Sequence, residues 1–219
     1  MKQIKQVLFF LLAIMGVATL GGCQQQAQTC HICGVMGNDQ YEGKRIFLVP
    51  LTGPATAETV DSIEIKDRRF VFTTDTMQMY KVLMDYHYRM GLQPLIVVGE
   101  PGTVKVVIDS VSHATGTPQN DSLEQWKVRT EMHNHRMALM NRSIAELRSL
   151  GNIQEADFLK QRKDSFHLAY KNYTRGMAKN MEGTVLGDFL KDLYPLTYKK
   201  ALPDGTTITI DADTNEEIH

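Results

Sequence analysis

The chain has 219 residues, 42% of them apolar, and a formal net charge of −1 at neutral pH. This length can bury one large core or two small ones, and the near-neutral balance argues against a nucleic-acid-binding protein. The charge is nevertheless uneven, since residues 122–200 hold 14 Lys and Arg against nine Asp and Glu. A basic helical half is suited to anionic lipid or an acidic partner, although interspersed acids are also typical of a solvated surface.

The first 22 residues have the three parts of a bacterial secretion signal. Lys2 and Lys5 form a basic start, an uncharged apolar run covers residues 7–20, and small residues precede Cys23. The run is shorter than the about 20 residues that a transmembrane helix needs. The sequence therefore predicts that residues 1–22 are a signal peptide outside the fold.

The end of this signal, Leu20-Gly21-Gly22-Cys23, resembles the lipobox of bacterial lipoproteins. The resemblance implies that the Cys23 thiol is lipidated and that Cys23 begins the mature chain, with residues 23–29 as a polar tether. Two or three acyl chains give nearly permanent membrane binding. Gln24 follows the cysteine, where an aspartate would signal inner-membrane retention. We therefore expect a cell-envelope protein anchored by lipid to the outer membrane, on its periplasmic face.

From Cys30 onward, apolar residues form short runs separated by turn residues. Such runs, bounded by Gly, Pro or Asp, are typical of strands. They cover residues 45–49, 60–65, 70–72, 79–86, 94–98 and 104–108. With an opening strand at Cys30, they predict an antiparallel β-sandwich or open barrel over residues 30–118.

The apolar pattern then changes to spacings of three and four, as in amphipathic helices. A first seam is expected at Leu123, Trp126, Thr130, His133, Met137, Met140, Ile144 and Leu147, and a second at Ala156, Leu159, Lys163, Phe166, Tyr170, Tyr173 and Met177. The break at Gly151 predicts an antiparallel hairpin whose first helix has Asn120, Asp121 or Ser122 as N-cap. The fold class is thus α+β, with a helical region at 119–196 and a tail at 197–219 containing one strand-like run, 206–210.

Five short motifs stand in order along this region. They are Ile32-x-Gly34, Gly43-Lys44-x-Ile46, Asp61-Ser62 with Phe70-x-Phe72, Glu100-Pro101-Gly102, and Gly116-Thr117-Pro118-Gln119-Asn120-Asp121. After a lipobox, this order resembles the Bacteroidota lipoprotein family called domain of unknown function 4369, over about residues 30–195. That family usually continues into a thioredoxin-like domain, which we expect to be absent here because no cysteine follows Cys33. Arg68 stands where the family's turn usually has Gly, so this turn must avoid a positive φ or accept strain.

Cys30-x-x-Cys33 is the first candidate for chemistry. A redox pair needs its first cysteine at a helix N-terminus, whereas the resemblance places both residues in the first strand. Residues three apart in a strand point to opposite faces, so the sulfurs should diverge. We interpret them as structural thiols and keep two alternatives, a disulfide or mixed disulfide formed in an oxidising compartment and a redox or metal role.

The remaining candidates have weaker patterns. His133 and His135 lie about 200° apart on a helix, so His133 is expected as a hydrogen-bonded seam residue and His135 as an outward one. A zinc site at Cys30 and Cys33 would need more ligands than His31 supplies. We therefore expect no metal site, no cofactor and no catalytic residue.

These features predict a non-enzymatic binding or accessory module of the cell envelope. Its partners would be the membrane, through the N-terminal lipid, and an envelope protein or small ligand, but no nucleic acid. The alternative is a thiol-disulfide redox accessory using Cys30 and Cys33. A surface binder of glycans or nutrients would need exposed aromatic residues on one sheet face, and Tyr80, Tyr86 and Tyr88 share a parity that a buried strand face also shows.

Overall fold

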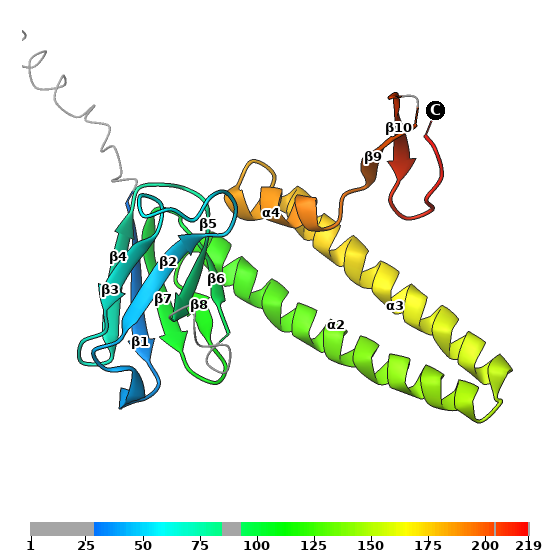
Figure 1. Ribbon diagram of the computed structural model, residues 1–219, viewed down its shortest axis with the longest axis horizontal. Helices are drawn as coiled ribbons and strands as arrows, with labels where there is room; N and C mark the ends of the chain where they lie inside the picture. The colour runs from blue at the N-terminus through cyan, green and yellow to red at the C-terminus, as the bar shows by residue number, and fades with distance from the viewer. Residues whose placement is uncertain (1–28, 85–92, 204, 219) are drawn as a thin grey trace, which may run out of the picture.

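The computed structural model describes residues 29–84, 93–203 and 205–218 (Figure 1). The expected signal peptide, Cys23 and the tether as far as residue 28 lie outside the described residues, as do Tyr86, His87 and Tyr88. The expectations for these residues stay predictions.

Two four-stranded sheets form a sandwich. One has the order β4 (Arg69–Thr74), β1 (Cys30–Met36), β7 (Gly102–Ile108) and β8 (His113–Thr115). The other has the order β3 (Asp61–Glu64), β2 (Arg45–Pro50), β5 (Met79–Met84) and β6 (Leu95–Val98). The strand pairs are antiparallel except for β1 and β7, which are parallel. The predicted α+β class is confirmed, and the sheets do not close into a barrel.

The core of the sandwich consists of alternate residues of its strands. In β1, Ile32 and Met36 are buried, whereas His31 and Val35 are exposed. Gly34 faces inward opposite Phe70 of β4, and a Cβ built on Gly34 would lie 1.8 Å from the Cζ atom of that ring. The motif Ile32-x-Gly34 is therefore a packing feature, because only glycine leaves room for the ring.

The tight turn between β3 and β4, closed by the bridge of Lys66 with Arg69, contains two residues with positive φ angles. Asp67 and Arg68 have φ angles of 51° and 58°, in the left-handed region that costs a non-glycine residue about 1–2 kcal/mol. The Glu42 carboxylate, which follows the single 3-10 turn η1 (Asp39–Tyr41), accepts the backbone N–H groups of Asp67 at 2.8 Å and Arg68 at 3.0 Å. These charge-assisted hydrogen bonds offset part of the strain.

Three helices follow the sandwich, α2 (Pro118–Ser149), α3 (Ile153–Asn180) and α4 (Val185–Leu193). Figure 1 shows α2 and α3 running side by side away from the sandwich. The short helix α4 lies next to the sandwich, where α3 ends. Within these described residues, no helix is long and apolar enough to cross a membrane. The predicted helical hairpin is confirmed.

The seam of α2 is as predicted, because each of its eight predicted residues, the first being Leu123 and the last Leu147, is buried or half-buried. The seam of α3 changes its position toward the sandwich. There the buried residues are Tyr170, Thr174 and Ala178, whereas the predicted Tyr173 and Met177 are only half-buried. Thr174 is tolerated inside because its hydroxyl accepts the indole N–H of Trp126 at 3.2 Å.

The first helix begins earlier than predicted. Thr117 is its N-cap and Pro118 its first residue, so the expected cap at Asn120, Asp121 or Ser122 is wrong. Asn120 is instead fully buried, and its side chain pairs with the backbone of Val98 through hydrogen bonds of 2.8 and 2.9 Å. Because Val98 belongs to an edge strand, the amide satisfies backbone groups that would otherwise be buried without partners.

The tail forms a two-stranded sheet of β9 (Thr197–Ala201) and β10 (Thr207–Asp211). The sequence predicted only the second strand, since all five β9 residues are exposed and lack apolar alternation. Asp213 binds both Lys171 and Arg175, which attaches the tail to α3. These contacts hold the pKa of Asp213 down at about 2.

Candidate functional site

The strand places the two candidate cysteines on opposite faces of a sheet. Cys30 is 2% exposed inside the core, whereas Cys33 is half-buried on the outer face, and both thiols are free. Burial raises the pKa of the Cys30 thiol, although a hydrogen bond with the backbone of Glu100 opposes the shift. The predicted divergence of the two sulfurs is confirmed, and a thiol kept protonated in a core is a poor nucleophile.

The other candidate residues are dispersed. His31 is exposed and lies 3.2 Å from the Thr73 hydroxyl, while His135 faces outward as predicted. Tyr80 is buried and shares a 2.9 Å hydrogen bond with Thr74, so it takes part in the core. Across the ranges that the structure describes, no three His, Cys, Asp or Glu side chains gather as a metal site would need.

A groove lies along one side of the helical hairpin. It has a volume of about 820 Å³ and runs between α2 and α3. We call it the hairpin face and define it by Val128, Arg129, Met132 and Arg136 of α2 together with Phe166 and Tyr173 of α3.

Arginines cover the aromatic rings of the hairpin face. The Arg129 guanidinium lies 4.2 Å from the ring centre of Tyr173, and the Arg136 guanidinium lies 4.8 Å from that of Phe166. Arg162 approaches Phe166 from α3 at 5.7 Å. Among the residues described, none of these three guanidiniums pairs with a carboxylate. Each guanidinium makes a cation–π contact with a ring and keeps N–H donors for a ligand.

The floor of the groove is a stack of polar aromatic side chains. The rings of His133 and Tyr170 are 4.1 Å apart and nearly parallel, and His133 Nε2 lies 3.2 Å from His167 Nδ1. The Tyr170 hydroxyl shares a 2.6 Å hydrogen bond with Thr130. Burial lowers the pKa of His133, with further lowering by His167 and Arg136. The contact with His167 confirms His133 as a hydrogen-bonded seam residue. This contact and the stack on Tyr170 fix the position of the His133 ring.

Apolar side chains flank this floor and face solvent. Val128 is 51% exposed and Met132 is 67% exposed. Sequence reasoning missed this surface because the seam accounts only for residues between the helices. The available signal was Val128, Met132 and Leu139, which repeat at spacings of four and seven beside the seam.

Comparison with known proteins confirms the domain that the motifs predicted, over a shorter segment than the expected residues 30–195. Residues 31–123 match the family described as Domain of unknown function (DUF4369). No curated protein and no solved structure matches the chain. The family match covers the sandwich and the start of α2, so the hairpin face lies beyond the matched segment.

Proposed function

We propose that this chain is a non-enzymatic binding module of the cell envelope, held by lipid on Cys23 at the periplasmic face of the outer membrane. The hairpin face is its binding surface, and its partner is an acidic amphipathic helix of another envelope protein. The observation that carries the proposal is the groove lined by two guanidiniums, of Arg129 and Arg136, that lie over aromatic rings and lack carboxylate partners within the described chain.

The shape of the groove suits a helix. Two packed helices leave a long hollow on each side of their contact, and a third helix fills such a hollow with side chains spaced three and four apart. Val128 and Met132 supply apolar contacts at its edge. Met132 is also unbranched and can adapt to an incoming side chain.

The charge of the groove selects the partner. Glu124 is the acidic residue in its lining, and its carboxylate Oε2 lies 2.6 Å from Lys127 Nζ. Arg129 and Arg136 therefore leave the hairpin face net positive. A partner helix with Asp or Glu beside its apolar stripe would gain bidentate hydrogen bonds to these guanidiniums.

The alternative function, a thiol-disulfide accessory using Cys30 and Cys33, has no support in the strand geometry. The two sulfurs lie on opposite faces of β1, and one is enclosed in the core.

The test is site-specific photo-cross-linking in living cells of the source bacterium. A photo-reactive amino acid replaces Met132, with Ala138, an exposed α2 residue outside the groove, as the control position. We expect a protein adduct from position 132 whose cross-linked peptide is an acidic amphipathic helix. The double variant Arg129→Glu, Arg136→Glu should reduce the adduct about tenfold or more, whereas Arg142→Glu, an exposed control, should not.

Three outcomes would overturn the proposal. One is equal adducts from positions 132 and 138, the second is an adduct that survives charge reversal, and the third is an adduct to lipid alone. In the third case, vesicles containing phosphatidylglycerol should retain the parent chain but not the Arg129→Glu, Arg136→Glu variant. The anchor has its own test, because Cys23→Ala should abolish incorporation of labelled fatty acid and persistent labelling would refute it.

A further inference from the structure

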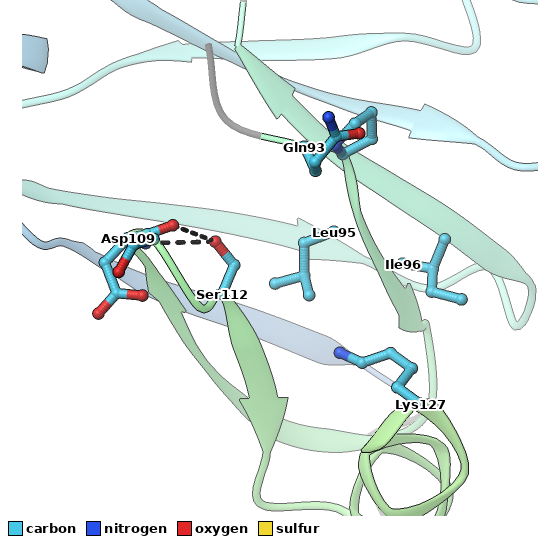
Figure 2. A pocket seen from close by; sticks show the side chains of 8 residues that line it. Gln93, Leu95, Ile96, Asp109, Ser112 and Lys127 are labelled. Atoms are coloured by element: carbon cyan, nitrogen blue, oxygen red, sulfur yellow. Dashed lines mark hydrogen bonds between the residues drawn. The ribbon is translucent and has the colours of Figure 1, made fainter. Parts of the chain in front are cut away.

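A second cavity, of about 330 Å³, lies where the sandwich meets α2 (Figure 2). It is bounded by Gln93, Leu95 and Ile96 around β6, by Asp109 and Ser112 between β7 and β8, and by Lys127 of α2. Three separate elements thus bring one ammonium, one carboxylate, one amide and the hydroxyls of Ser110 and Ser112 around apolar side chains. This volume lies within the range of small-molecule sites.

Lys127 is oriented against the usual preference of lysine. A surface lysine covers apolar residues with its stem and places its ammonium in water. Here the Nζ atom is buried, and no described residue accepts a hydrogen bond from it. Its 2.6 Å approach to Glu124 is an ion pair without hydrogen-bond geometry. In Figure 2 the ammonium end is directed toward the side of the cavity that holds Leu95 and Ser112.

The charge of Lys127 is compensated by Glu124, but an ammonium has three N–H groups and Glu124 does not accept from all of them. The remaining N–H groups lack acceptors among the described residues, so an acceptor in the cavity would stabilise them. These donors therefore point to a ligand with an oxygen atom placed near α2.

The opposite wall needs a donor. Asp109 accepts the backbone N–H of Val111 at 2.7 Å through Oδ1, and no described residue donates to its Oδ2. The Ser112 hydroxyl donates to the Asp109 carbonyl at 3.0 Å and is held beside that carboxylate. A ligand group that reaches this wall can donate a hydrogen bond to Asp109.

We infer that this cavity binds a small uncharged polyol, of the size of one monosaccharide. A hydroxyl both donates and accepts, so neighbouring hydroxyls can accept from Lys127 and donate to Asp109. An anion is disfavoured because Lys127 is already paired with Glu124, which leaves Asp109 as uncompensated negative charge. Leu95 and Ile96 line the cavity from opposite faces of β6 and supply apolar contacts for the C–H groups of a sugar. This inference does not rest on the proposed function, because the hairpin face is a different surface.

The experiment is saturation-transfer NMR on the full chain with D-glucose, D-galactose and N-acetyl-D-glucosamine at millimolar concentrations. At least one sugar should receive saturation from the protein. Lys127→Met and Asp109→Asn should each weaken its binding about tenfold. Lys105→Met, an exposed lysine of β7, should leave binding unchanged.

The Lys127→Met variant leaves Glu124 without its ion-pair partner, so a second variant, Lys127→Met with Glu124→Gln, provides a neutral site. Both are compared only where the thermal melt matches that of the parent chain. The inference fails if no sugar binds, if binding is equal in the parent and the neutral double variant, or if acetate or phosphate binds through Lys127 instead.

Discussion

The carboxylate of Glu100 holds the first turn of α2 through Gln119. The backbone N–H of Gln119 donates to Glu100 Oε1 at 2.7 Å, and its side-chain amide donates to Oε2 at 3.1 Å. The backbone N–H of Asn120 adds a third hydrogen bond at 3.1 Å. Gln119 also accepts the backbone N–H of Leu186 at 2.9 Å, which extends the network to α4. One buried carboxylate thus joins the sandwich to the helices.

Replacing Glu100 with alanine should therefore destabilise the whole fold. The change leaves two buried backbone N–H groups and one amide without acceptors, and it removes a negative charge from a helix N-terminus. We expect a loss of about 3 kcal/mol in the free energy of unfolding, measured by urea denaturation. Glu131→Ala, at an exposed position of α2, should change it by less than about 0.5 kcal/mol. Equal effects of the two substitutions would contradict this role.

This junction also shows where sequence reasoning stops. Glu100 lies in the connection between β6 and β7, and Pro101 and Gly102 are local signals of this connection that need no tertiary context. The partners of Glu100 could not be predicted, since they depend on how α2 meets the sandwich. The role of Asn120 could not be predicted either. Asparagine is a preferred N-cap residue, but here its side chain pairs with the backbone of an edge strand.

The strands and helices were predictable wherever burial follows a period. Burial alternates in β1, β4 and β7, and the α2 seam repeats at three and four, because one side of each element meets the core. β9 was missed because its residues are exposed and its conformation comes from pairing with β10. The hairpin face was missed for a related reason, since Arg129 and Tyr173 meet only after two helices have packed.

Gly34 and Gly176 should respond oppositely to alanine. A Cβ at Gly34 would overlap the Phe70 ring, so Gly34→Ala should cost about 3 kcal/mol or more in unfolding free energy. A Cβ at Gly176, inside α3, would meet nothing within 4 Å, and alanine there should add about 1 kcal/mol. Thermal and urea unfolding would measure both. If Phe70→Ala did not reduce the cost of Gly34→Ala, steric overlap with the ring would be the wrong explanation.

Arg68→Gly should stabilise the β3–β4 turn. Glycine removes the strain of a positive φ, about 1–2 kcal/mol, but adds freedom to the unfolded chain that cancels about 0.4–1 kcal/mol. The exposed ion pair of Arg68 with Asp39 contributes little to this balance. A net gain of roughly 0.5–1 kcal/mol is expected in urea unfolding. Arg69→Gly, within strand β4, should destabilise instead, and a gain there would refute the explanation.

The two thiols should differ strongly in reactivity. Burial raises the pKa of Cys30 and encloses its sulfur, whereas Cys33 lies half-buried on the outer face. In chains that carry Cys23→Ser, the Cys30→Ser variant should therefore react with iodoacetamide at pH 8 much faster than the Cys33→Ser variant. The difference should vanish in urea, where both thiols are exposed. Equal rates in the folded state would indicate that β1 does not enclose Cys30.

Titration of His133, in the floor of the groove, should make the stability of the fold depend on pH. Burial, followed by His167 and Arg136, lowers the pKa of His133 below the value near 6.5 of a free histidine. Between that value and the lower folded pKa, the unfolded chain binds more protons than the folded chain. Stability must therefore fall as pH falls through this window, and it should change little from this source above about pH 7.

Replacing His133 with glutamine removes the titrating group while keeping a side chain that can donate and accept. We expect urea unfolding between pH 7 and pH 5 to show a shallower loss of stability in His133→Gln than in the parent chain. His135→Gln is the matched control, because His135 is exposed on the same helix and should leave the slope unchanged. The same slope in the parent and His133→Gln would show that burial does not lower the pKa of this histidine.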